Sequence, residues 1–543
     1  MKSKTANPWS DLHPEACRRE KLFQQTLQFK IIPTEELAMK SFALLTTVSL
    51  ISLSTLATVR PLMALESRQP AETWIAQGNI QDAIGHYNRG IDYIQQEKYD
   101  LALAEFTKAI ELDPNYTEAY NNRGFLYAGQ GKPDLALSDF NQAININPRL
   151  AEAYLNRGFL YYEQGKSDLA LSDYNQAINI NPRLAEAYVN RGLLYGGQGK
   201  PDLALSDFNQ AININPRLAE AYLTRGNLYA GQEKPDLALS DFNQAININP
   251  RDAQAYNNRG LLYGGQGKPD LALSDFNQAL NINPRLAEAY LNRGNLYARQ
   301  GKPDLALSDY NKAININPLL GWAYYNRGVL YARQGKLDLA LSDFNQEINI
   351  NPRNAEAYLN RGVLYGEQGK PDLALSDYNK TININPRDAR AYNNRGVLYG
   401  KQGKPDLALS DFNQAININP GYADAYLNRG ILYAGQGKPD LALSDYNQAI
   451  NINPRNADAY YNRGILYAGQ GKPDLALSDY NQAININPQD AWAYVRRGIL
   501  YYYRKETEKV IGDLRQAAEL FRQQGNAALY EKVMELLRQL GAV

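Results

Sequence analysis

A segment of 34 residues recurs along this chain, and this repetition limits its possible folds more than any other feature. Residues 117–150 read TEAYNNRGFLYAGQGKPDLALSDFNQAININPRL, and residues 151–184 read AEAYLNRGFLYYEQGKSDLALSDYNQAININPRL. The period continues without insertion from residue 83 to residue 524, which makes thirteen units. Such a period is typical of solenoids, in which each unit buries its apolar face only against its neighbours.

Two helical patterns of apolar and small residues lie within each unit. Counted from residue 83 as position 1, they occupy positions 4, 8 and 11 and then positions 20, 24, 27 and 28. A Gln-Gly-Lys-Pro-Asp turn separates them, and proline suits the first position of a helix because no N–H is needed there. Asp134 complements the positive N-terminus of that helix, and Pro148 ends the unit. Each unit is therefore predicted to be an antiparallel helix pair.

These positions resemble the pattern of the tetratricopeptide repeat family. Glycine occupies position 8 and tyrosine position 11 in all thirteen units, as in Gly124 and Tyr127. Tyrosine fills position 4, alanine position 20 and proline position 32 in twelve units each. The resemblance implies an all-α, right-handed superhelical solenoid with the first helix of each pair on the concave side. The last residues resemble the ends of cyanobacterial members of the family, which implies a bacterial source.

Both ends of the array are expected to carry caps, because the terminal units lack a neighbour on one side. Residues 525–543 form the predicted C-terminal capping helix, with Leu529, Val533, Leu536, Leu537 and Leu540 along one stripe. Residues 65–82 are predicted to hold a linker and an N-terminal capping helix, in which Trp74 packs inward.

The first part of the chain has the layout of an export signal. Residues 41–59 carry no charge and follow Lys40, and small residues precede Leu65. We therefore expect residues 39–64 to be a cleaved signal peptide or a membrane anchor, with membrane association through residues 41–59. Residues 1–38 are expected to be an extension or a misassigned start. The expected location is exported, periplasmic or envelope-associated, with the cytoplasm as the alternative if the segment is no signal.

The composition argues against several classes of function. Lys plus Arg and Asp plus Glu each total 57, so the chain lacks the basic surplus that nucleic-acid binding needs. It has two histidines and one cysteine, too few for a metal cluster or a Cys/His nucleophile. We therefore expect no cofactor, no metal site and no catalytic activity.

The candidate binding residues lie on the first helices. In the family, positions 2, 5, 6, 9, 12 and 13 face the concave groove. Position 6 is asparagine in eleven units, and an amide can pair with a peptide backbone of any sequence. This row is similar to the asparagine ladder of O-linked N-acetylglucosamine transferases; its alternative role is to cap a neighbouring turn. The predicted peptide-binding members are Asn122, Asn156, Asn190, Asn258, Asn292, Asn326, Asn360, Asn394, Asn428 and Asn462.

Two further features depart from the family pattern. Position 7 is arginine and position 23 is acidic in all thirteen units, which predicts a structural ion-pair ladder, such as Arg123 with Asp139. In repeat eight, Trp322 and Tyr325 are predicted to form a binding hot spot, while Glu347 replaces a packed alanine. The alternatives for this part of the array are a looser joint and drift among recently copied repeats.

The function that these patterns favour is a non-catalytic scaffold for proteins or extended peptides. The asparagine row leaves open an accessory or targeting subunit for a separate enzyme, such as a glycosyltransferase. A small-molecule binder that uses the 40 tyrosines is less favoured, because most of them fall at packing positions.

Overall fold

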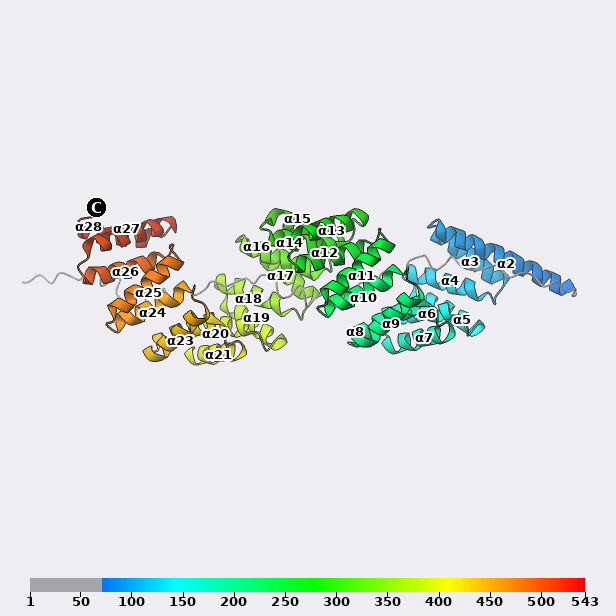
Figure 1. Cartoon of the computed structure of the whole chain (residues 1–543), viewed down its shortest axis with the longest axis horizontal. Helices are drawn as coiled ribbons and strands as arrows, with labels where there is room; N and C mark the ends of the chain where they lie inside the picture. Colours follow the sequence, from blue (N-terminus) through cyan, green and yellow to red (C-terminus); the bar gives the residue numbers. More distant parts are fainter. Residues whose placement is uncertain (1–70, 543) are drawn as a thin grey trace, which may run out of the picture. The chain divides into compact units, whose positions relative to one another are not determined.

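The structure, a computed structural model, describes residues 71–542, with side chains from residue 80 onward. Every regular element in this part of the chain is an α-helix, and 27 of them follow one another as α2–α28 (Figure 1). The predicted extension (1–38), signal or anchor (39–64), membrane-associated segment (41–59) and the first part of the linker lie outside the described residues, as does the side chain of Trp74. No described helix is both long enough and apolar enough to cross a membrane.

The described helices fall into two compact bodies. The N-terminal body, residues 71–316, contains α2 (Ala71–Gln95), α3 (Tyr99–Leu112), α4 (Thr117–Gly129), α5 (Pro133–Ile146), α6 (Ala151–Glu163), α7 (Ser167–Ile180), α8 (Ala185–Gly197), α9 (Pro201–Ile214), α10 (Ala219–Gly231), α11 (Pro235–Ile248), α12 (Ala253–Gly265), α13 (Pro269–Ile282), α14 (Ala287–Arg299) and α15 (Pro303–Ile316).

The C-terminal body, residues 317–542, contains the remaining helices. These are α16 (Gly321–Arg333), α17 (Leu337–Ile350), α18 (Ala355–Glu367), α19 (Pro371–Ile384), α20 (Ala389–Lys401), α21 (Pro405–Ile418), α22 (Ala423–Gly435), α23 (Pro439–Ile452), α24 (Ala457–Gly469), α25 (Pro473–Ile486), α26 (Ala491–Tyr503), α27 (Thr507–Gln523) and α28 (Ala527–Gln539).

The turn inside most pairs follows from a glycine and a lysine. Gly131 has φ +69°, a left-handed conformation that glycine adopts without steric cost. The N–H of Lys132 then donates to the carbonyl of Tyr127 at 2.9 Å, which satisfies an otherwise free helix-end acceptor. The Lys132 ammonium lies 5.8 Å from the centre of the Tyr127 ring. The second helix of the pair, α5, begins at Pro133, as the sequence predicts.

The turn between pairs depends on asparagine and proline. Asn147 ends α5, and its side-chain oxygen accepts from the N–H of Arg149 at 3.0 Å. Pro148 cannot continue the helix, because it has no N–H to donate. The thirteenth unit has Arg522 in place of this proline, and α27 extends to Gln523 before Gly525 (φ +70°). These local signals explain why the predicted helix pairs are confirmed throughout the described repeats.

The two caps differ from each other in how well the sequence predicts them. At the C-terminal end, α28 buries Val533, Leu536 and Leu537 against α27, and Leu529 and Leu540 pack beside them, as predicted. At the N-terminal end, the predicted capping helix is not a separate element. It continues into the first repeat as one helix, Ala71–Gln95, because no proline or left-handed glycine interrupts the chain there.

In repeats one to twelve, the aromatic side chain at position 24 packs against the glycine at position 8. In repeat four, Ala204, Phe208 and Ala211 are buried, and a Cβ on Gly192 would lie 2.6 Å from the Phe208 ring. The same contact, at 2.5–3.0 Å, leaves no room for a side chain at position 8 in the twelve repeats that have an aromatic ring at position 24, whereas Gly498 of repeat thirteen faces Leu514 at 3.9 Å. The two helices of the pair can approach closely only because position 8 is glycine.

Each body curves with its first helices on the inside. Successive first helices, such as α4, α6 and α8, contact one another, whereas successive second helices such as α5 and α7 have no comparable contact. The same pattern holds for α18, α20 and α22 in the C-terminal body. The first helices therefore line the concave face, as the resemblance implies. The handedness of the superhelix stays a prediction.

Repeat eight accommodates a buried carboxyl by a second substitution. Glu347 is 0% exposed, and its Oε1 accepts from Nδ2 of Asn354 at 2.5 Å, while Oε2 has no partner. A Cβ at position 321 would lie 1.9 Å from Oε2, and position 321 is glycine where most units have alanine. Gly321 therefore provides the space that Glu347 fills. Burial raises the pKa of Glu347 above its usual range, and hydrogen bonds from Asn354 and Asn351 oppose that rise.

This pair predicts a pH-dependent stability. In the unfolded chain Glu347 has an ordinary pKa, so the folded state binds more protons at this site. The stability of the fold therefore falls as pH rises from the unfolded-state pKa through the higher folded-state pKa. We expect Glu347→Gln to stabilise the full chain by about 1–2 kcal/mol at pH 7.5, and by much less at pH 4.5. Thermal unfolding of both proteins at the two pH values measures the difference.

A matched set of variants separates packing from charge. Gly321→Ala alone should destabilise the chain by about 1–3 kcal/mol, because the new methyl group overlaps the carboxyl. Gly321→Ala combined with Glu347→Ala restores the alanine pair of repeats such as four, and should recover that loss. A double variant as unstable as Gly321→Ala alone would contradict the pairing.

Candidate binding face

The concave face of each body presents the same positions in every repeat. Position 9 is apolar in most units, and Phe125, Phe159 and Leu193 are half-buried there. Position 13 is often glycine, and a Cβ on Gly197 or Gly231 would meet nothing within 4 Å. Half-buried apolar side chains beside open space are the features that a peptide groove needs.

Six of the predicted asparagines are already engaged with the preceding repeat. The Nδ2 of Asn156 donates to Oδ1 of Asn121, 35 residues earlier, at 3.0 Å. Asn360 donates in the same way to the hydroxyl of Tyr325 at 2.9 Å. The partner lies at position 5 in five cases and at position 9 in one. The remaining pairs are Asn122 with Tyr87, Asn258 with Asn227, Asn292 with Asn257, and Asn428 with Asn393.

The other four predicted asparagines follow a repeat with leucine at position 5. Asn190 is 8% exposed, and its Nδ2 has no partner, because Leu155 offers no acceptor. Asn462 donates instead to the carbonyl of Asp458 in its own helix, and Asn394 accepts from Asn393. Asn326 is buried. Ligand contact by the ten asparagines stays a prediction, but the structure already gives six of them a role in joining repeats.

The two predicted hot-spot residues of repeat eight differ in placement. Tyr325 is 2% exposed and packs against the Phe344 ring at 5.9 Å, so in this structure it is part of the core rather than of the surface. Trp322 is partly buried and meets the edge of Tyr325 at 5.5 Å. The bond from Asn360 explains why a tyrosine can be buried here, since its hydroxyl has a partner.

The predicted ion-pair ladder is confirmed in repeats two to thirteen. The Arg123 guanidinium donates two parallel hydrogen bonds to the Asp139 carboxylate, from Nε to Oδ2 and from Nη2 to Oδ1, both 2.8 Å. Across these repeats the aspartate side chains are 4–8% exposed and the arginine side chains 16–19%. In the first repeat Arg89 bonds to Glu105, which also contacts His86. Bidentate pairs of this kind are stronger than exposed single contacts.

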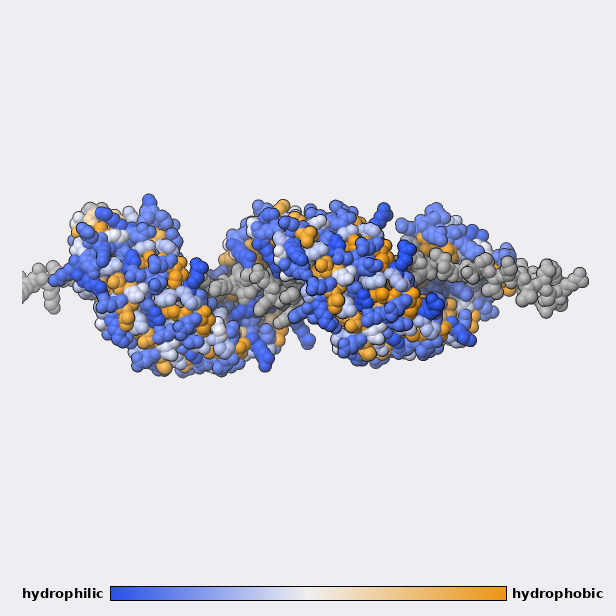
Figure 2. Space-filling model, in the orientation of Figure 1, coloured by the Kyte–Doolittle hydropathy of each residue, from blue (hydrophilic) through white to orange (hydrophobic). Residues whose placement is uncertain are grey.

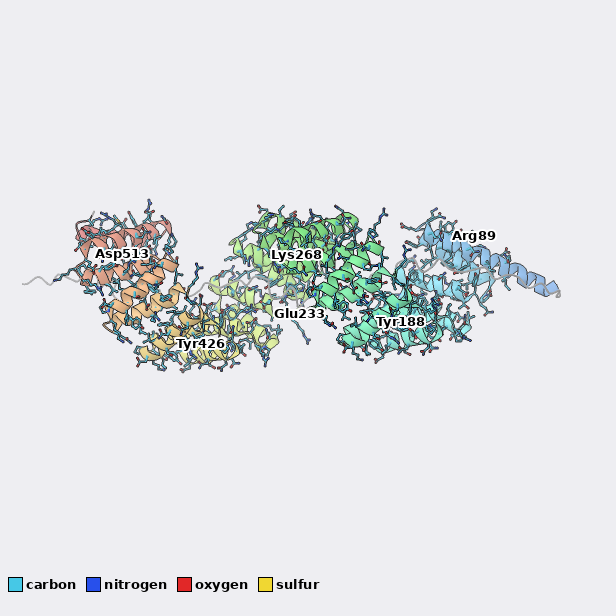
Figure 3. All side chains as sticks on the ribbon, viewed as in Figure 1. Arg89, Tyr188, Glu233, Lys268, Tyr426 and Asp513 are labelled. Atoms are coloured by element: carbon cyan, nitrogen blue, oxygen red, sulfur yellow. The ribbon has the colours of Figure 1, made fainter. Side chains whose placement is uncertain are left out.

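The same arginines also join neighbouring repeats, which sequence reasoning missed. The Nη1 of Arg157 donates to Oδ1 of Asn141 in the preceding repeat at 2.7 Å. Its guanidinium lies between the rings of Tyr154 and Tyr161, at 5.5 and 5.8 Å from their centres. The signal was present, because position 25 is asparagine in eleven units. Figure 3 labels Tyr188 and Tyr426, whose rings face Arg191 and Arg429, and Asp513, which pairs with Arg497.

The charged residues at position 2 of the first helices differ in their ion pairing between the two bodies. In the C-terminal body, Arg390 forms ion pairs with Glu356 and Asp388. In the N-terminal body, position 2 carries five glutamates that form no ion pair within the part of the chain that the structure describes. These are Glu118, Glu152, Glu186, Glu220 and Glu288.

No group of three or more metal-ligating side chains occurs among the described residues. The surface shows small apolar patches dispersed over a largely hydrophilic exterior (Figure 2). The candidate site is the extended concave face of the first helices.

Known families match this architecture. The family described as "TPR repeat" matches residues 90–131, 130–165, 160–199, 226–267, 330–369 and 436–471. "Tetratricopeptide repeat" matches residues 185–218, 253–286, 287–318, 355–388, 389–422 and 457–490, and again 309–342 and 412–444. Together the matches run from residue 90 to residue 490, with a gap at 219–225. The chain belongs to the tetratricopeptide repeat family, whose members bind proteins or peptides and are typically non-catalytic.

Several solved structures are similar to this chain. A chain of the APC/C hetero-tetramer Cut9–Hcn1 aligns with TM-score 0.48 and 14% identity, over 86% of this chain and 98% of that one. YrrB, described as a TPR protein with an unusual peptide-binding site, has TM-score 0.30 and 28% identity, over 34% and 95%. A tetratricopeptide repeat protein of Parabacteroides merdae has TM-score 0.37 and 26% identity, over 48% and 99%. No curated protein sequence matches the chain at a significant level.

The ion-pair network predicts the effect of removing one carboxylate. We expect Asp139→Asn to destabilise the second repeat by about 1–3 kcal/mol, because Arg123 keeps its charge in a half-buried site without a counter-charge. Amide hydrogen exchange of peptides from α4 and α5 in the full chain measures this local loss. Asp134→Asn, at an exposed position of the same helix, is the control and should cost about 0.3–1 kcal/mol. Equal effects of the two substitutions would contradict a structural role for the pair.

Proposed function

We propose that this protein is a non-catalytic scaffold that binds an extended segment of another protein along the concave face of its first helices. Family membership supports the general activity, since tetratricopeptide repeat proteins bind proteins or peptides. The observation that carries the proposal for this face is its regularity. Successive first helices contact one another and repeat the same positions, so the concave face offers one kind of surface to a long partner.

The concave face has the components for such binding. Half-buried apolar side chains at position 9 can receive apolar side chains of the partner. Glycine at position 13 leaves room for the partner's backbone to approach.

Filling the open glycines provides a direct test. We expect the combined variant Gly197→Gln, Gly231→Gln, Gly265→Gln, Gly435→Gln and Gly469→Gln to lose the partner proteins that the unaltered chain captures from extract of the source organism. The added side chains would occupy the groove, and glutamine favours a helix over glycine by about 0.8 kcal/mol, so the fold should persist. Quantitative mass spectrometry of the captured proteins is the measurement.

The matched control adds the same side chains to exposed positions of second helices. It combines Ser206→Gln, Ser240→Gln, Ser274→Gln, Ser444→Gln and Ser478→Gln, all at position 22. This variant should capture the same partners as the unaltered chain. If the serine variant lost them and the glycine variant kept them, the binding face would have to be the second helices.

We also propose that residues 39–64 direct the chain out of the cytoplasm. The uncharged residues 41–59 after Lys40 support this, as do the small residues before Leu65. Purification from the source organism followed by N-terminal sequencing should give a mature chain that begins at Leu65. A mature protein that retains residues 41–59 in the soluble cytoplasmic fraction would contradict export.

A further inference from the structure

Glu347 places a fully buried carboxyl group where three helices of the C-terminal body meet. It lies on α17 at position 27, which is alanine in eleven units. Its side chain is 0% exposed; Oε1 accepts from Nδ2 of Asn354 at 2.5 Å, and Oε2 is buried without a partner. An ionised carboxyl with an unbonded oxygen costs more free energy in such a contact than the neutral acid does.

The contacts of this carboxyl join α17 to both neighbouring first helices. Gly321, the first residue of α16, leaves the space that the carboxyl fills. Asn354 precedes α18, and its Oδ1 accepts from the N–H groups of Glu356 and Ala357 at 3.1 and 3.3 Å. One amide therefore caps α18 and also bonds to Glu347. Water can reach the unbonded oxygen only if the start of α16 moves away from α17 or if this cap is released.

Repeat nine shows that a polar side chain at position 27 is not in itself a weakness. Thr381 is also 0% exposed, and its hydroxyl lies within hydrogen-bonding distance of the carbonyls of Asp377 and Ala355, at 3.0 and 3.3 Å. The threonine is neutral and finds its acceptors in its own repeat. Repeat eight differs because its buried group can ionise and one of its oxygens has no donor.

The charged groups around this carboxyl supply no counter-charge. Asp343, one turn earlier on α17, is paired with Arg327 of α16. Glu356 on α18 is paired with Arg390 of α20. The titratable group of α16 that interacts with the carboxyl is the hydroxyl of Tyr325, and burial raises the pKa of Tyr325 further above its usual range, so it stays neutral. Ionisation therefore adds an uncompensated negative charge to the junction.

We propose that Glu347 is a proton-controlled latch within the C-terminal body. The neutral acid keeps α16, α17 and α18 packed together, and loss of the proton favours a state in which the start of α16 separates and water hydrates the carboxylate. Trp322 is the second residue of α16, so the open state changes the surface that repeat eight presents. This regulation goes beyond the proposed function, because it sets the state of one repeat whatever the groove binds.

The direction of the pH dependence follows from linkage. In the open state the carboxyl of Glu347 is hydrated and has an ordinary pKa, whereas burial raises its pKa in the closed state. Opening therefore releases a proton. The equilibrium constant for opening rises about tenfold per unit of pH between the two pKa values, and it levels off above the closed-state value. Because each repeat contacts only its neighbours, the opening stays local to repeats eight and nine.

Amide hydrogen exchange of the full chain at pH 4.5, 6.0 and 7.5 tests the latch. Protection of α16 peptides, corrected for the intrinsic exchange rate at each pH, is compared with that of α8 peptides, whose repeat has the alanine pair Ala185 and Ala211. We expect the protection of α16 relative to α8 to fall by about tenfold or more between pH 4.5 and 7.5.

Three variants assign this change to the buried carboxyl. Glu347→Gln keeps the shape of the side chain without its charge, and should keep the protection of α16 constant over the pH range. Gly321→Ala combined with Glu347→Ala restores the packing of other repeats and should do the same. Glu367→Gln removes a charge from an exposed position of α18, and should leave the pH dependence of α16 as it is in the unaltered chain.

Three results would overturn the latch. The first is an equal change of protection in α16 and α8, and the second is a pH dependence that survives in Glu347→Gln. The third is an equal loss of protection in peptides of α22, three repeats further along, because this would mean that the whole C-terminal body unfolds rather than one junction.

Discussion

The contact between an aromatic ring and a glycine is the constraint on which twelve of the thirteen repeats depend. The glycine at position 8 lets the ring at position 24 approach to a distance that a Cβ would block, as Gly192 and Phe208 show. This close approach brings position 7 of the first helix opposite position 23 of the second, where arginine and aspartate form a bidentate pair. The same arginine then reaches Asn175 of the preceding repeat. Packing within a repeat thereby sets the polar contacts between repeats.

The pairing of these charges explains which charges remain for function. A half-buried arginine without its carboxylate would be costly, and the repeats satisfy it with an internal partner in every case described. Within the part of the chain that the structure describes, the glutamates at position 2 of the N-terminal body have no ion-pair partner. They lie on the same first helices as the arginines of position 7, whose charges are paired.

Departures from the repeat show what the fold tolerates. Glu347 is accepted in place of alanine because Gly321 makes room for it and Asn354 bonds to it. Glu233 occupies a left-handed position, φ +58°, where ten repeats have glycine (Figure 3). Such a conformation is unfavourable for glutamate, yet α10 and α11 still form the regular pair. Because each repeat contacts only its neighbours, a local cost of this kind does not spread along the array.

The period, the helix pairs, the turns, the C-terminal cap and the Arg123–Asp139 type of ion pair could all be predicted from the sequence. These features follow from spacing within one unit, where residues 3 or 4 apart share a helix face and residues 16 apart, such as Arg123 and Asp139, meet across the antiparallel pair. The polar groups that meet across repeats became clear only from the folded structure. Asn156 reaches Asn121, and Tyr325 is buried beneath Asn360, through contacts that span 35 residues. Such contacts depend on how one helix pair is rotated against the next, and a hydrophobic pattern does not specify that rotation to the precision of a hydrogen bond.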